Sequence, residues 1–81
     1  MSFTIEDLTR IARETIGDRR IELTPAMAAV DVPGWDSLNH TVISMTIAFE
    51  FGLELTPKQL GAAANFGEVV AMVNRVLGEA G

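Results

Sequence analysis

The stretch GWDSL, residues 34–38, decides the fold, because it ends a long connection and opens a long apolar helix. Asp36 is a favourable N-cap residue, whose carboxylate accepts a hydrogen bond from a backbone amide two or three residues later. Ser37 then falls at the first helical position, where capping does not need it and its hydroxyl is free to face solvent. Backbone amides and the helix dipole favour an anion there. The stretch therefore predicts a helix start that tolerates a phosphate ester on Ser37 better than a mid-helix serine would.

The residues after this turn predict a helix over 37–51, with Gly52 as its C-terminal stop. Two apolar stripes follow helical spacing along it: Leu38, Thr41, Met45 and Phe49 form one, and Ile43, Ile47 and Phe51 form the other. A helix that is apolar around much of its circumference is either central, with contacts on several sides, or offers one face to a partner. Both interpretations apply to this helix.

The residues before the connection predict a first helix that starts at Thr4 and stops at Gly17. Thr4 and Asp7 have the spacing of a capping box. One apolar stripe comprises Ile5, Leu8, Ile11, Ala12 and Ile16. Basic and acidic side chains alternate between residues 6 and 20, which indicates a solvated face and not a basic patch.

The connection over residues 18–36 loses the helical period and contains Pro25, Pro33 and Gly34. Loops of this length are uncommon in compact domains unless they are functional or disordered. This one is too apolar for disorder, so we expect it to pack along the bundle through Ile21, Leu23, Met27, Val30 and Val32. Trp35 is expected to pin the loop to the helix that follows, and the alternative is that its ring stacks on a ligand.

Two more helices follow Gly52. Thr56 and Gln59 form a capping box around Pro57, which predicts a short helix ending near Gly61 or Ala64. Asn65 and Glu68 cap a last helix, which Gly78 and the small tail end, and its stripe comprises Phe66, Val69, Val70, Val73, Val76 and Leu77. We therefore expect an all-α fold in a single domain over residues 1–81: a small four-helix bundle with three longer helices, one short helix and a long loop between the first two.

Composition excludes several classes of function. Six basic and eleven acidic residues give a net charge of −5, which opposes nucleic-acid binding and favours partners with basic faces. With no cysteine and one histidine, the chain has no disulfide framework and no structural zinc site. No apolar run is long enough to cross a membrane and no export signal is present, so we expect a cytoplasmic protein. We also expect it to be a monomer.

The residues around Ser37 resemble the attachment motif of acyl and peptidyl carrier proteins. Asp36-Ser37-Leu38 follows Pro33-Gly34-Trp35 and precedes a long apolar helix closed by Phe51-Gly52. The likeness runs from about residue 23 to residue 76 and includes Leu55-Thr56-Pro57 before the short helix. The resemblance implies that a phosphopantetheinyl transferase attaches phosphopantetheine from coenzyme A to Ser37, and that acyl intermediates are held on the arm as thioesters.

The resemblance also implies a protein that is not an enzyme and that serves acyl-loading and acyl-processing enzymes. Leu38 corresponds to a hydrophobic contact for the transferase, with Asp36 and His40 beside it. The family places acidic residues on the outward face of the helix over 37–51, at positions corresponding to Val42, Ala48 and Phe49, whereas only Glu50 is acidic here. We therefore expect Val42 and Phe49 to meet partners through a more hydrophobic contact. The alternative for Phe49 is that it belongs to the core.

The same resemblance leads to an expectation for the cargo, the group that the arm would carry. A free-standing chain favours fatty acid, polyketide or specialised pathways, and the lack of acidic residues favours a specialised one. The first alternative is a peptidyl or aminoacyl carrier, and the second is an unmodified helical module that binds another helix through its apolar face.

A serine hydrolase is rejected, although Ser37 and His40 share a helix face. Nothing obvious orients the imidazole, and no large pocket forms in so small a core. His40 is instead expected at the surface beside the arm, where it contacts the phosphate or a partner, or is an ordinary exposed histidine.

Overall fold

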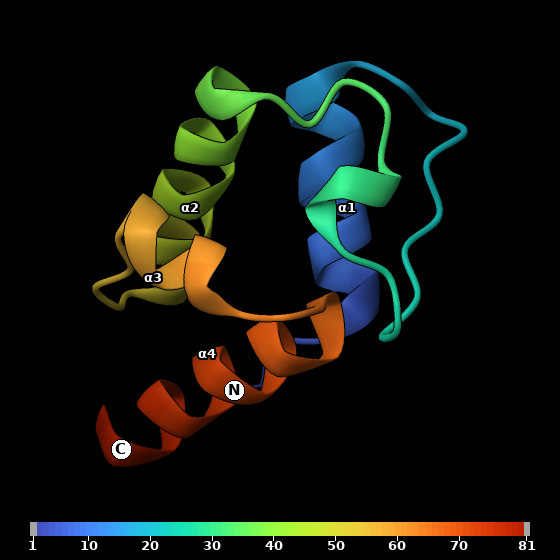
Figure 1. Ribbon diagram of the computed structural model, residues 1–81. Coiled ribbons are helices and arrows are strands. Elements are labelled where there is room, and N and C mark those ends of the chain that lie inside the picture. The colour runs from blue at the N-terminus through green and yellow to red at the C-terminus, as the bar shows by residue number, and fades with distance from the viewer. Residues whose placement is uncertain (1, 81) are drawn as a thin grey trace.

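The helices of this protein form an all-α bundle, as predicted. The computed structural model describes residues 2–80. Along that part of the chain lie the helices α1 (Ile5–Ile16), η1 (Ala29–Asp31), α2 (Ser37–Phe51), α3 (Pro57–Ala62) and α4 (Phe66–Ala80), of which η1 is a short 3₁₀-helix. In Figure 1, α1 and α2 run side by side in opposite directions, α3 lies against the lower part of α2, and α4 crosses below them.

Local capping sets the ends of the helices. The Thr4 hydroxyl accepts a hydrogen bond from the Asp7 amide at 3.1 Å, and the Asp7 carboxylate accepts one from the Thr4 amide at 3.0 Å. Gly17 and Gly52 end α1 and α2 in the left-handed conformation. The predicted boundaries of α1, α2 and α3 are confirmed, but α4 continues through Gly78 to Ala80. A glycine at the end of a helix is a stop only where the chain turns left-handed, and Gly78 does not.

The core lies between the inner faces of α1, α2 and α4. Its largest fully buried side chains are Phe3, Leu8, Ile11, Ile43, Ile47, Val73 and Ser44. Phe3, which precedes α1, packs edge-on against Phe51 at the end of α2, with 5.0 Å between the ring centroids. The second predicted stripe of α2, through Ile43 and Ile47, therefore faces the core.

The long loop packs along the bundle, as predicted. Its side chains Ile21, Leu23 and Val32 are buried, and Arg13 of α1 donates a hydrogen bond from Nε to the Ile21 carbonyl at 2.6 Å. The prediction was wrong for Val30, which is 93% exposed. Val30 is the middle residue of η1, whose turn directs this side chain away from the bundle.

The loop also supplies hydrogen-bond acceptors to the start of α4. The Phe66 amide donates to the Met27 carbonyl at 2.8 Å, and the Gly67 amide donates to the Pro25 carbonyl at 2.9 Å. The Glu68 amide donates to the Asn65 side chain at 2.9 Å, which confirms the predicted cap. The first amides of a helix have no partner within the helix, so these contacts join the loop to α4.

One side chain of α4 holds the residue that precedes α1. The Asn74 amide oxygen accepts a hydrogen bond from the Phe3 amide at 2.7 Å, and the Asn74 amide nitrogen donates one to the Phe3 carbonyl at 2.8 Å. Both hydrogen bonds are partly buried. This pair, called the Phe3–Asn74 clamp below, joins positions that lie 71 residues apart.

The charged face of α1 is solvated and balanced, as expected. Arg10 lies 3.3 Å from the Glu50 carboxylate of α2, and it also faces Asp7 and Glu14. The hydrogen bond to Glu50, with the charges of these carboxylates, raises the pKa of the Arg10 guanidinium above its ordinary value. Glu50, the one acidic residue of α2, is therefore paired with α1.

A second exposed ion pair lies at the start of the long loop. The hydrogen bond from Arg20 lowers the pKa of the Asp18 carboxyl below its ordinary value. A depressed carboxyl pKa stabilises the fold above the pKa of the unfolded chain, and this stabilisation is lost as the pH falls through the folded value. Both side chains are exposed to solvent screening, so the pair contributes little.

Two glycine substitutions are expected to have opposite effects on stability. Gly34 has φ +88°, and a Cβ atom there would lie 2.8 Å from Cγ2 of Ile16. Gly34→Ala should therefore lower the free energy of unfolding by about 1–2 kcal/mol or more. Gly78 is helical with no atom in the way, so Gly78→Ala should raise it by up to about 1 kcal/mol. Urea denaturation of both variants measures the difference, and equal effects would contradict this account of Gly34.

Candidate functional site

Ser37 lies exposed at the start of α2. The cap is Asp36, whose carboxylate accepts a hydrogen bond from the Asn39 amide at 2.8 Å. The Asn39 side chain donates to the Gly34 carbonyl at 2.8 Å, which ties the preceding turn to the helix. These contacts leave the Ser37 hydroxyl without a hydrogen-bond partner among residues 2–80. The predicted geometry of the turn is confirmed.

His40 is not an ordinary exposed histidine. Its Nδ1 accepts a hydrogen bond from the Trp35 indole Nε1–H at 3.0 Å, and its Nε2 lies 2.8 Å from the Pro57 carbonyl oxygen. An indole N–H only donates and a carbonyl only accepts, so the proton of the imidazole is on Nε2. The prediction that nothing orients the imidazole was wrong, because Trp35 and Pro57 hold it from two sides.

The orientation of His40 bears on the rejected hydrolase pair. A general base needs a ring nitrogen that is free to accept the proton of the serine. Both nitrogens of His40 are already engaged, by Trp35 and by Pro57. In this structure His40 therefore has no ring nitrogen that is free to accept the proton of Ser37.

Trp35 joins three parts of the bundle. Its indole ring lies 5.1 Å from the ring of Phe66 at the start of α4, at an interplanar angle of 33°. Its N–H binds His40 of α2, and its backbone belongs to the long loop. Trp35 therefore pins the loop to α2, as predicted, and also to α4. The sequence predicted neither the hydrogen bond to His40 nor the ring contact with Phe66, because both depend on how the chain bends before α2.

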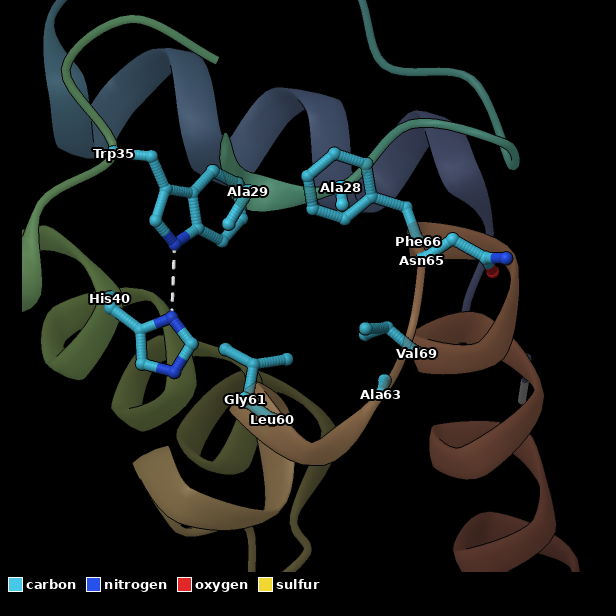
Figure 2. Close-up of a pocket in the computed structure, with 10 residues that line it drawn as sticks. All are labelled: Ala28, Ala29, Trp35, His40, Leu60, Gly61, Ala63, Asn65, Phe66 and Val69. Carbon is cyan, nitrogen blue, oxygen red and sulfur yellow. Dashed lines mark hydrogen bonds between the residues drawn. The ribbon is translucent and has the colours of Figure 1, made fainter. Parts of the chain in front are cut away.

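A small cleft lies beside the Trp35–His40 pair, between the loop, α3 and the start of α4 (Figure 2). Its volume is about 50 Å³, whereas ordinary ligand pockets have volumes of about 300–1,000 Å³. In Figure 2, Trp35 and His40 form one side of the cleft, and Phe66 and Val69 form the other. The remaining lining residues are Ala28, Ala29, Leu60, Gly61, Ala63 and Asn65.

A larger and more open hollow lies on the other side of His40, next to Ser37. It measures about 470 Å³ and is lined by Ala29, Trp35, Asp36, Ser37, His40, Thr41, Pro57 and Lys58. Lys58, at the second position of α3, brings a positive charge to the hollow. Lys58 lies inside the capping box of α3, between Thr56 and Gln59, and nothing in that local pattern predicts its place beside Ser37, which depends on how α3 packs against α2.

An exposed apolar strip runs along α2 from the residue next to Ser37. Leu38 is 72% exposed and Phe49 is 89% exposed, so Phe49 is not a core residue. Ala48 packs partly against the core, which corrects its expected outward position. The other strip residues are Val42 and Met45, and the four together are called the α2 strip below. Of the five expected partner contacts, Leu38, Val42 and Phe49 lie on it, whereas Asp36 caps the helix and His40 binds Trp35.

No family model matches this chain, and neither a curated protein nor a solved structure matches it significantly. Across residues 2–80, the structure contains no helix that is both long and apolar enough to cross a membrane. Among the side chains that the structure describes, no group of three or more histidines, aspartates or glutamates lies together in a way that could hold a metal ion. The candidate site thus consists of Ser37, the open hollow beside it and the α2 strip.

Proposed function

We propose that this protein is an acyl carrier protein, with phosphopantetheine attached to the Ser37 oxygen. The observation that carries the proposal is the free, exposed hydroxyl of Ser37 at the first position of a helix that Asp36 already caps. A hydroxyl in this position can be esterified without loss of an internal hydrogen bond. The resemblance of residues 34–38 and of the following helix to the carrier attachment motif supports the same assignment.

The residues around Ser37 fit the phosphate of such an arm. The first amides of α2 and the helix dipole favour a negative charge at this end of the helix. Lys58 lines the hollow that Ser37 opens into and adds a positive charge. The arm, when attached, supplies a terminal thiol, which this chain lacks because it contains no cysteine. Ser37 provides the anchor, and the helix start and Lys58 provide a favourable setting for the phosphate.

The α2 strip is the proposed contact for partner enzymes. Leu38 follows Ser37 directly, so an enzyme that reaches the arm also reaches this end of the strip. The only charged residue of α2 is Glu50, and Arg10 neutralises it. A transferase or an acyl-processing enzyme would therefore meet Leu38, Val42 and Phe49 mainly through apolar contacts, which is consistent with a specialised pathway in the cytoplasm.

The size of the cleft limits how the cargo is held. An acyl chain does not fit into about 50 Å³ unless one wall of the cleft moves outward, either α3 or the side that carries Trp35. The small side chains of α3 and of the segment after it, among them Ala63, favour such a movement of α3, which would have to break the His40–Pro57 hydrogen bond and uncover Leu60. The proposed cargo is acyl, and a peptidyl or aminoacyl cargo is the alternative.

A second candidate function is an unmodified interaction module. It is favoured by the α2 strip, because large apolar side chains that are exposed together mark interaction surfaces. In this case a partner helix would lie along α2, and Ser37 would have no chemical role.

Intact mass spectrometry separates the two candidates. The purified protein is incubated with coenzyme A and a broad-specificity phosphopantetheinyl transferase. A carrier is expected to gain the mass of one phosphopantetheine group. A folded protein that gains no mass would contradict the carrier assignment and favour the interaction module. Circular dichroism of the same sample establishes that the protein is helical.

A further inference from the structure

The chain contains one tryptophan and one histidine, and they are hydrogen-bonded to each other. The indole N–H of Trp35 donates to Nδ1 of His40, while Nε2 of His40 donates to the Pro57 carbonyl. A protonated imidazole carries hydrogen on both nitrogens and has no acceptor left. It can keep the bond to Pro57, but it cannot keep the bond to Trp35. Protonation of His40 and the Trp35–His40 bond therefore exclude each other.

The position of this bond determines what its loss would change. Trp35 and His40 together form one wall of the cleft, with Phe66 and Val69 opposite (Figure 2). His40 joins α2 to the first residue of α3, and that link survives protonation. Trp35 belongs to the loop, and its tilted contact with Phe66 would remain. The cleft would thus loosen on the side of the loop, and not between α2 and α3.

Few charges face His40. Asp36, at the start of its own helix, and Lys58, on α3, line the open hollow on one side of the ring. The residues that line the cleft on the other side are uncharged, both those from the loop and those from α4. No carboxylate lines the cleft, so no acidic side chain there could take the place of the imidazole as acceptor for the indole N–H.

We propose that Trp35 and His40 form a proton-operated latch on the cleft. With neutral His40 the latch is closed, and the indole is held against α2. With protonated His40 the indole N–H loses its acceptor, and the indole ring is released from α2, while Gly34 and Asp36 on either side of it stay bonded to Asn39 and α3 stays attached to His40. The latch is a property of the folded chain, whether or not Ser37 is modified, and it would couple access to the cleft to pH.

The single tryptophan makes the latch directly observable. Acrylamide quenching of Trp35 fluorescence is measured on the full chain between about pH 8 and pH 5, the range in which histidine changes its charge. The His40 imidazole and the Trp35 indole N–H are followed by NMR over the same range. The quenching constant is expected to rise by about twofold with the same midpoint as the imidazole, because release exposes a ring that is half-buried in the closed state. The indole N–H resonance should move with that midpoint.

Two variants test the assignment. In His40→Gln, the amide oxygen can accept from Trp35 and the amide nitrogen can donate to Pro57 without titrating, so quenching should not change with pH. Asp36→Asn keeps a good N-cap and removes the carboxylate that lines the hollow beside His40, so quenching should still rise as the pH falls. The proposal is overturned if wild-type Trp35 does not respond while His40 becomes protonated, or if His40→Gln responds as the wild type does. Should His40→Gln fail to fold, an indole N–H resonance that does not follow His40 in the wild type overturns it equally.

Discussion

Ser37→Ala is expected to abolish attachment of phosphopantetheine while the fold is retained. The exposed hydroxyl has no hydrogen-bond partner in the described chain, so its removal should change the free energy of unfolding by less than about 0.5 kcal/mol. The mass gained with coenzyme A and a transferase should fall from one group per chain to none. The measurement is intact mass spectrometry, with a thermal melt of each sample.

Ser44→Ala is the matched control. Ser44 lies two turns further along α2, is fully buried, and donates a hydrogen bond to the Thr41 carbonyl at 2.8 Å. Its substitution should leave the mass gain intact and should lower stability by about 1 kcal/mol. A mass gain that persists in Ser37→Ala would disprove the attachment site, and a loss of the gain in both folded variants would show that the assay reports something other than Ser37.

Among the substitutions proposed for this protein, Ile47→Ala is expected to lower the free energy of unfolding most. Ile47 is fully buried between α2 and the rest of the core, and a buried isoleucine replaced by alanine loses about 2–5 kcal/mol. A domain of this size is stabilised by only about 5–10 kcal/mol in total, so a substantial fraction of the stability would be lost. Urea denaturation followed by circular dichroism measures the change.

Phe49→Ala is the control for Ile47→Ala, because Phe49 lies two residues further along α2 on its exposed face. This substitution removes a larger side chain than Ile47→Ala does. Because Phe49 is 89% exposed, the free energy of unfolding should still change by less than about 0.5 kcal/mol. If the two variants were equally destabilised, the division of α2 into a core face and an exposed strip would be wrong. If the α2 strip is the docking surface, Phe49→Ala should weaken partner binding more than Ile47→Ala does.

The helix boundaries could be predicted because they depend on local chemistry. Capping boxes bind the free backbone amides within one helical turn, as Thr4 with Asp7 and Thr56 with Gln59 do. Glycine adopts the left-handed conformation freely, which ends α1 at Gly17 and α2 at Gly52. Such signals need no knowledge of the rest of the fold. The exposed position of Ser37 was predictable for the same reason, since it follows from the cap at Asp36.

The orientation of α2 could not be predicted in the same way. Its two apolar stripes are both consistent with burial, and which one faces the core depends on where α1 and α4 lie. The outcome separates Ile47 from Phe49, although both are apolar and close in sequence. Likewise, the contact of His40 with Pro57 depends on the placement of α3, 17 residues away. These features follow from tertiary packing, which periodicity does not describe.

The Phe3–Asn74 clamp has a consequence for the cooperativity of the fold. Because both hydrogen bonds come from a single side chain of α4, any opening of that helix also deprives the Phe3 peptide of its partners. The backbone of Phe3 thus shares the opening equilibrium of α4, the helix at the other end of the chain. In native-state hydrogen exchange, the Phe3 amide is therefore expected to exchange together with the amides of α4, despite their distance in sequence.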